Sequence, residues 1–198
     1  MENDFFLYEL ADSNKKKEVE HMTDYEKSVM RNIIYAVETG GQVYGNKDYG
    51  NFTEAYTNSS NEEAITIGAG QWYATEAQRL LNTIRTKNPA LFASLDTAGI
   101  GSDLDNRNWS TYRESKNSDK ARCIVSIIDS ETGRQCQDAL LDEQMEGYIQ
   151  EAAALGVNDM DAKMMCANFR HQGGRGAVTR ILAKTDQPYT LDHLYAAC

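Results

Sequence analysis

The stretch "AVETGGQVYG", residues 36–45, places an acid, Glu38, at the end of an apolar run and two glycines directly behind it. Upstream, Thr23 and Glu26 have the spacing of a capping box, a paired set of hydrogen bonds that begins a helix. Between these two signals the apolar residues recur at helical spacing: Val29, Ile33, Ile34 and Val37. The sequence therefore predicts an amphipathic helix over residues 24–38 that carries Glu38 on its last turn and ends at the glycines.

The residues after this helix favour turns and short strands. The clusters "GNKDYGN" (45–51) and "TNSSN" (57–61) are rich in turn formers, and "AITIGAGQW" (64–72) is a β-rich run broken by two glycines. We therefore expect residues 42–70 to contain a small antiparallel sheet, and the only β-structure of the chain.

Helical patterns return after this region and continue to the end of the chain. Thr75 and Gln78 repeat the capping-box spacing, and further patterns occupy residues 119–128, 136–156, 159–174, 175–185 and 190–198. Between residues 87 and 119 we expect mostly loop, with one short helix near 89–95. The predicted fold class is α+β and mainly α: a small antiparallel sheet beside a helical lobe. Residues 1–20 are expected to form an arm or leading helix ahead of one domain over residues 21–198.

Composition and charge exclude several classes of protein. The chain has 198 residues, 41% of them hydrophobic and 25% charged, which is typical of a globular domain with a sizeable core. Its formal net charge of −10 argues against nucleic acid as a partner. No apolar run approaches the roughly 20 residues of a membrane helix, and the first residues lack a Sec signal pattern.

The cysteines favour structural rather than chemical roles. Cys123, Cys136 and Cys166 lie inside helical apolar patterns, which predicts buried free thiols, although one disulfide remains open for a protein that works outside the cell. Cys166 and His171 lack the companions that a zinc site needs. We expect no metal and no organic cofactor.

The position of Glu38 predicts an unusual carboxyl group. Burial and the partial negative charge at a helix C-terminus both favour the protonated acid, and both raise its pKa. An acid that is still protonated near neutral pH can donate a proton to a leaving oxygen, and glycines behind it leave room for a bulky polymer. The alternative is that Glu38 is a solvated carboxylate at a helix end.

Two motifs in this order resemble those of the lysozyme-like superfamily. "VETGG" is similar to the "ESGG"-type element of lytic transglycosylases, and "TIGAGQ" (66–71) is similar to the "TIGIGH"-type element of small phage lysozymes. The two motifs span about a fifth of the chain. The resemblance implies a lysozyme-like fold and a peptidoglycan glycosidase, either a muramidase or a lytic transglycosylase.

The resemblance also assigns roles to individual residues. Glu38 would be the general acid, and Thr66 would position a water or a sugar group while facing Glu38 across the cleft. Gln71 stands where the family has a histidine, which implies a substrate hydrogen bond rather than proton transfer. Thr66 could equally be an ordinary strand residue.

The second carboxylate is the least defined part of the site. Small phage lysozymes carry an aspartate about half a dozen residues before the threonine, where this chain has Ser60 and Asn61. Glu62 is the nearest substitute, and strand alternation would place it on the same face as Thr66. Asp48 and Glu54 are further candidates, and each could be only a surface acid. With none of them, Glu38 would act alone, as in lytic transglycosylases.

Four residues are candidates for binding the substrate: Tyr44, Gln71, Trp72 and His171. Trp72 and the adjacent Tyr73 either stack on sugar rings or belong to the core. His171, in "NFRHQGGRG" (168–176), either lines the same cleft or is a histidine satisfied at a helix end.

The function predicted from these observations is cleavage of the β-1,4-linked N-acetylmuramic acid/N-acetylglucosamine backbone of bacterial peptidoglycan. The resemblance implies a phage endolysin or similar wall-degrading domain, made in the host cytoplasm and acting on the wall, or exported. The end at "LYAAC" would fit a catalytic domain followed by a wall-binding module. The alternatives are a glycosidase acting on chitosan or chitin, and a non-catalytic glycan-binding protein on the same scaffold.

Overall fold

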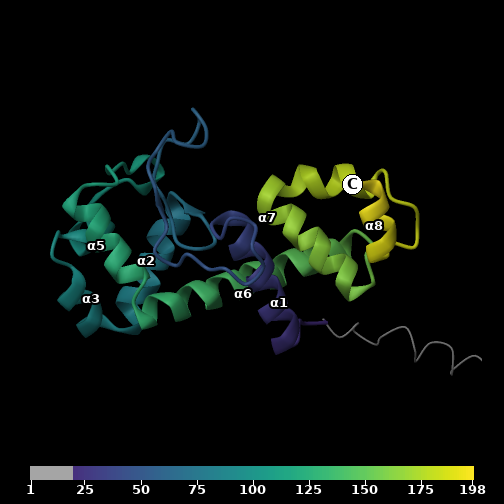
Figure 1. Cartoon of the computed structure of the whole chain (residues 1–198), viewed down its shortest axis with the longest axis horizontal. Helices are drawn as coiled ribbons and strands as arrows, with labels where there is room; N and C mark the ends of the chain where they lie inside the picture. Colours follow the sequence, from purple (N-terminus) through teal and green to yellow (C-terminus); the bar gives the residue numbers. More distant parts are fainter. Residues whose placement is uncertain (1–19) are drawn as a thin grey trace, which may run out of the picture.

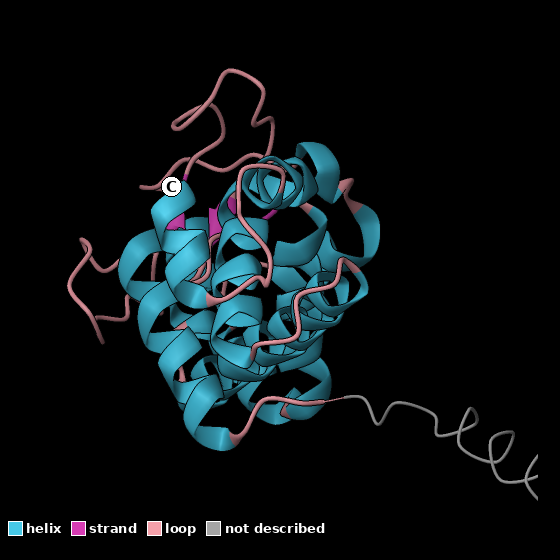
Figure 2. Ribbon diagram, turned by 90° about the vertical axis from the view of Figure 1, so that its right-hand side faces the viewer, coloured by secondary structure: helices cyan, strands magenta, loops and turns pink. Residues whose placement is uncertain are grey.

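Figure 1 shows the computed structural model of the chain, which describes residues 20–198. The expected N-terminal arm, residues 1–20, lies outside the described residues except for Glu20. Helices make up nearly all of the regular structure, and the strands form one small patch (Figure 2). The mainly helical α+β class predicted from the sequence is confirmed.

Helix α1 (Asp24–Glu38) has the predicted bounds and the predicted capping box. The backbone N–H of Thr23 donates to the Glu26 carboxylate at 2.6 Å, and the Glu26 N–H donates back to the Thr23 hydroxyl at 3.3 Å. Ile34 and Tyr35 are fully buried on the inner face. The helix ends at Glu38 because the chain leaves helical geometry at Thr39, ahead of the two glycines.

The sheet has three antiparallel strands in the order β1 (Phe52–Thr53), β2 (Thr66–Ile67) and β3 (Trp72–Tyr73). The prediction that all β-structure lies within residues 42–70 is wrong, because β3 lies beyond that range and pairs Trp72 with Ile67. Positive φ angles at Gly68 (76°) and Gln71 (53°) close a tight turn, and the Gln71 N–H donates to the Gly68 carbonyl at 3.1 Å. This turn returns the chain along β2 before the next helix begins.

Seven α-helices and one short 3₁₀-helix follow in the described chain: α2 (Thr75–Lys87), α3 (Pro89–Leu95), α4 (Ile100–Asn106), η1 (Trp109–Thr111), α5 (Asp119–Ile128), α6 (Glu131–Ala154), α7 (Met160–Leu182) and α8 (Leu191–Ala197).

Two expectations for this region are wrong. Residues 87–119 hold α4 and η1 as well as the expected α3, because the Asp96 carboxylate accepts hydrogen bonds from the N–H groups of Ile100 and Gly101 at 2.6 and 2.8 Å. The capping box expected at Thr75 does not form, since α2 is preceded by Ala74, which has no side-chain cap.

Helix α6 runs lengthwise through the molecule, between a group of shorter helices and the α7–α8 pair (Figure 1). On one side, α1, the sheet and α2 to α5 share a large apolar cluster with α6 that includes Ile67, Leu80 and Leu141. On the other side, the end of α6 packs with α7 and α8 in a smaller cluster around Leu194. The sheet and α7 thereby come to lie along the same long helix.

Helix α7 contains a kink where the sequence predicted a helix end. Gly174 adopts φ 70° and ψ −177°, which only a glycine takes readily, so the helical rise is broken there and resumes at once. The expected boundary is therefore correct in position, but it is a kink within one helix. His171 and Gln172 lie immediately before it.

The four cysteines are free thiols, and Cys123, Cys136 and Cys166 are buried as predicted. Burial raises the pKa of the Cys166 thiol to about 11, so it stays protonated and unreactive at neutral pH. Within residues 20–198, no helix combines the length and apolarity needed to cross a membrane.

Replacing Thr23 with alanine removes the capping box without touching the buried face of α1. We expect the free energy of unfolding to fall by about 1 kcal/mol. Chemical denaturation followed by circular dichroism measures the loss. Thr86→Ala, at an exposed position inside α2, is the matched control. A loss for Thr23→Ala no larger than that of the control would contradict the capping role.

Candidate active site

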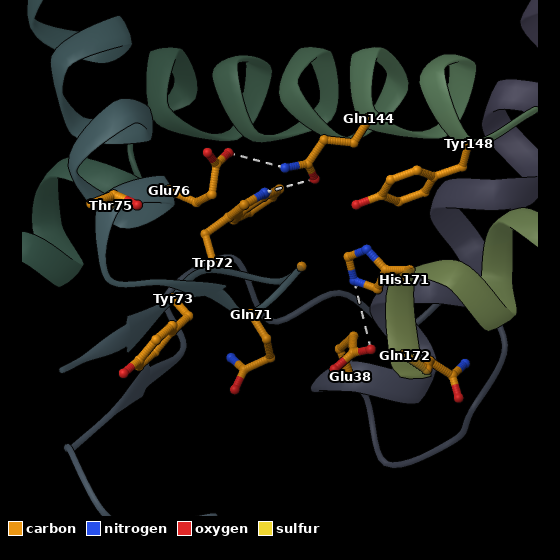
Figure 3. A pocket seen from close by; sticks show the side chains of 11 residues that line it. Glu38, Gln71, Trp72, Tyr73, Thr75, Glu76, Gln144, Tyr148, His171 and Gln172 are labelled. Carbon is orange, nitrogen blue, oxygen red and sulfur yellow. Dashed lines mark hydrogen bonds and ion pairs between the residues drawn. The ribbon is translucent and has the colours of Figure 1, made fainter. Parts of the chain in front are cut away.

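Glu38, at the end of α1, lines a groove of about 380 Å³ between the sheet, α6 and α7 (Figure 3). The turn and strand from Gly70 to Tyr73 form one wall, together with Thr75 and Glu76 at the start of α2. Helices α6 and α7 supply the rest of the lining: Gln144, Tyr148, His171 and Gln172. Four separate segments therefore converge on the carboxyl group that the sequence singled out.

Glu38 and His171 form the centre of the groove. The His171 Nε2 lies 3.6 Å from the Glu38 Oε1, and the two side chains are 11% and 22% exposed. Figure 3 shows the two groups facing each other from α7 and α1. The prediction left open whether His171 lines the cleft, and the structure places it there.

Burial pushes both groups toward their uncharged forms. Desolvation raises the pKa of the Glu38 carboxyl above its ordinary value. Desolvation also lowers the pKa of His171 to about 4, against a small upward effect from a hydrogen bond with the Gly70 backbone. The imidazole is therefore neutral at pH 7, and no positive charge on it favours ionisation of Glu38. At pH 7 a neutral imidazole therefore lies beside a carboxyl group whose pKa is raised by burial.

Trp72 belongs mainly to the core, which decides between the two roles considered for it. Its side chain is 2% exposed and packs edge-on against Tyr35, with ring centroids 6.4 Å apart. The indole N–H donates to Gln144 Oε1 at 3.2 Å, and Gln144 Nε2 donates to Glu76 at 3.1 Å. This chain of bonds links the sheet, α6 and α2 along one side of the groove (Figure 3).

Gln71 lines the groove as expected, but its amide is already engaged in the protein. Its Nε2 donates to Asn51 Oδ1 at 2.9 Å and to the Gly68 carbonyl at 3.1 Å. Its positive φ is strained for a residue with a side chain, and these bonds hold it in place. Gln71 therefore shapes the wall of the groove through the turn that it closes.

The other predicted catalytic residues do not line this groove. Thr66 is 5% exposed in the central strand, where it pairs with both Thr53 and Tyr73. Glu62 lies before β2 and outside the groove, because the strand is only two residues long and the alternation that would align Glu62 with Thr66 does not reach it.

The remaining candidates are also elsewhere. The Glu54 carboxylate accepts hydrogen bonds from Ser115 and Lys116, and Asp48 borders a separate hollow beside α5. Tyr44 is 64% exposed in the loop after α1 and does not line the groove.

Several groove residues were not found from the sequence: Glu76, Gln144, Tyr148 and Gln172. Glu76 is the second carboxylate of the groove, and its local sequence does not distinguish it from any other acid in the first turn of a helix. Gln144 and Tyr148 lie one turn apart on α6, so they share a helix face. Nothing in their local sequence marks that face as facing a groove.

Comparison of the chain with protein-family models, with curated proteins and with solved structures found no match. Among residues 20–198, no group of three or more His, Cys, Asp or Glu side chains could hold a metal ion. The chemistry of the site is therefore argued from its geometry.

His171 should make the protein less stable as the pH falls. An unfolded histidine binds a proton below about pH 6.5, whereas folded His171 does so only near pH 4. Stability is therefore lost as the pH falls through this window, because the unfolded state binds more protons there. Between pH 7.5 and 4.5 we expect the free energy of unfolding of the wild type to fall by about 2 kcal/mol more than that of His171→Gln. Denaturant titration at both pH values checks this, and equal slopes would contradict the burial of a neutral imidazole.

Proposed function

We propose that the chain is a glycosidase that cleaves the β-1,4-linked N-acetylmuramic acid/N-acetylglucosamine backbone of bacterial peptidoglycan, with Glu38 as the general acid. The observation that carries this proposal is a largely buried carboxyl, with its pKa raised by desolvation, that faces an open polar groove beside a neutral imidazole. A general acid needs this combination of a retained proton and access to substrate. The "VETGG" and "TIGAGQ" resemblance supports the assignment to peptidoglycan.

In the proposed reaction Glu38 protonates the glycosidic oxygen. The bond between that oxygen and the anomeric carbon breaks, and its electron pair leaves with the oxygen. Positive charge develops on the anomeric carbon, and Glu38 becomes a carboxylate. The carbon is then captured by water, which gives a reducing end, or by the hydroxyl on carbon 6 of the same sugar, which gives a 1,6-anhydro end. In either case the nucleophile gives up one proton, and in the anhydro reaction the proton of the carbon-6 hydroxyl returns to the Glu38 carboxylate.

Glu76 is the residue proposed to receive that proton when water is the nucleophile. In the described part of the chain it is the one carboxylate besides Glu38 that lines the groove. Its hydrogen bond from Gln144 and its contact with Arg79 at 3.4 Å orient it on the α2 side. Two carboxylates on opposite sides of a groove are the usual equipment of a hydrolytic glycosidase.

The lining of the groove fits an uncharged sugar polymer. Within the described residues it contains two acids, three glutamines and two tyrosines, and no lysine or arginine. Amides and hydroxyls match the hydroxyl and acetamido groups of amino sugars, whereas a polyanion would meet no compensating charge.

The same absence of cations favours one second candidate, a chitosan-degrading glycosidase. Chitosan carries amino groups that are positively charged, and a groove that contains the Glu76 carboxylate and no lysine or arginine would attract it. Chitosan and purified walls should therefore be tested in parallel.

Digestion of purified peptidoglycan, followed by mass spectrometry of the fragments, tests the proposal directly. Reducing muramic acid ends identify a muramidase, anhydro ends a transglycosylase, and reducing glucosamine ends a glucosaminidase. Release of fragments from chitosan alone would favour the second candidate. No fragments from either polymer would contradict the glycosidase proposal.

Replacing Glu38 with glutamine keeps its size and removes the transferable proton. We expect wall cleavage to fall on the order of 10²–10⁴-fold. The folded pKa of Glu38 is raised, so this residue stabilises least at neutral pH, and Glu38→Gln should unfold at a slightly higher temperature at pH 7. Release of soluble fragments and the melting temperature measure the two effects. Glu62→Gln, which changes a carboxylate outside the groove, is the matched control. Wild-type turnover in Glu38→Gln would contradict the role of Glu38 as general acid and leave it only a role in binding.

The second carboxylate is tested by Glu76→Gln. We expect formation of reducing ends to fall on the order of 10²-fold, because the attacking water loses its base, while the glutamine can still bond Gln144. Asp48→Asn and Glu54→Gln, both outside the groove, serve as comparisons and should stay within about twofold of the wild type. Full activity of Glu76→Gln would contradict its assignment as the base.

A further inference from the structure

Gln137, in α6, is fully buried and lies outside the groove, yet its side chain bonds three separate segments of the chain. Its Nε2 donates to the carbonyls of Tyr49 at 3.0 Å and Ile128 at 2.9 Å. Its Oε1 accepts the backbone N–H of Ala69 at 2.9 Å. The amide therefore uses both of its donor hydrogens and its acceptor in the interior, where an unmade bond is costly.

Ala69 connects this buried amide to the segments that carry Glu38 and His171. The Ala69 carbonyl accepts the hydroxyl of Thr39 at 3.4 Å, and Thr39 directly follows Glu38. The next residue, Gly70, lines the groove, and its backbone hydrogen-bonds His171. The turn at Ala69 thus contacts Gln137 on one side and the segments carrying Glu38 and His171 on the other.

The packing around this turn leaves no room for a side chain at Gly68 or Gly70. A Cβ atom added at Gly68 would lie 2.6 Å from the Gln137 Oε1 and 2.9 Å from the Trp72 ring. One added at Gly70 would lie 2.8 Å from the same ring. All three distances are shorter than real Cβ contacts, so the backbone of the turn lies directly against the amide and the indole.

We propose that Gln137 is a positioning residue: it fixes the turn Gly68–Gln71 from behind and thereby sets the separation and the water exclusion of Glu38 and His171. It touches neither substrate nor the reacting atoms. The catalytic part of this inference rests on the proposed glycosidase function, whereas its effect on the two titrating groups does not.

The desolvation of Glu38 and His171 depends on a closed turn. Without the bond to Ala69, water gains access to both groups. The pKa of Glu38 should then fall toward its ordinary value, and the pKa of His171 should rise from about 4 toward 6.5.

Gln137→Met tests this inference because methionine keeps the length of the side chain and removes its hydrogen bonds. The matched control is Leu141→Ala, which lowers stability through a cavity one turn further along α6, at a residue that is also fully buried. Titrations of Glu38 and His171 followed by NMR, at a temperature where circular dichroism shows both variants folded, are the first readout. We expect both midpoints to move in Gln137→Met and to stay in place in Leu141→Ala.

Wall cleavage is the second readout. We expect kcat of Gln137→Met to fall on the order of tenfold with KM changed less than about threefold, because substrate contacts remain while the acid is misplaced. The alkaline limb of the rate profile should move to lower pH. Gln137→Met with unchanged midpoints and unchanged kcat would show a purely structural amide and overturn the proposal.

Two further results keep the test decisive. If Gln137→Met does not fold, Thr39→Val cuts the other side-chain bond to Ala69, and it should move the midpoints in the same directions. Unmoved midpoints in Thr39→Val would then overturn the proposal. If the wild type cleaves no wall polymer, the proposed function fails, while the NMR titrations still decide the role of Gln137.

Discussion

The structure of the site depends on the contact between the C-terminal end of α1 and the turn Gly68–Gln71. This contact removes water from Glu38 without supplying a cation, so its carboxyl group keeps its proton to a higher pH than a free glutamate does. The turn can approach so closely because two of its residues are glycines and because Trp72 and Gln137 hold it on both sides. Both contacts lead to helix α6: Gln144 accepts the indole N–H of Trp72, and Gln137 accepts the backbone N–H of Ala69 in the turn. The long helix therefore serves as the common support for the acid and the wall opposite it.

Because of burial, the stability contributed by His171 and the stability contributed by Glu38 depend on pH in opposite directions. His171 is held neutral, so the stability it contributes is lost as the pH falls. The pKa of Glu38 is raised, so the stability it contributes is lost as the pH rises through that pKa. Neither group is compensated by an ion pair at neutral pH, although their side chains lie 3.6 Å apart. For stability alone, an apolar residue in place of either Glu38 or His171 would be more favourable. Two largely buried titratable side chains with shifted pKa values in a polar groove are typical of a functional site.

The parts of the fold that could be predicted are those specified by neighbouring residues. The capping box of Thr23 and Glu26, the apolar spacing behind it and the glycines after Glu38 act within a few residues, and α1 has the expected bounds. The position of the kink in α7 was predicted in the same way, because Gly174 interrupts the helical pattern locally. The strand β3 and the helix α4 could not be read this way. β3 depends on a turn at a non-glycine residue with positive φ, and α4 depends on a carboxylate, Asp96, that caps it from four residues upstream.

The sequence by itself determined the helical class and the position of Glu38 at a helix end, because these depend on local backbone preferences and on the spacing of apolar residues. Only the tertiary structure decided which side chains share the groove. Glu62 and Thr66 seemed suitable from their distance along the chain, but a strand of two residues carries no extended alternation, and Thr66 is enclosed between its neighbours. Glu76, Gln144 and His171 come from three different helices, α2, α6 and α7. They meet beside Glu38 because α2 and α7 both pack against α6, and this packing follows from the burial of apolar faces distributed over many elements of the chain.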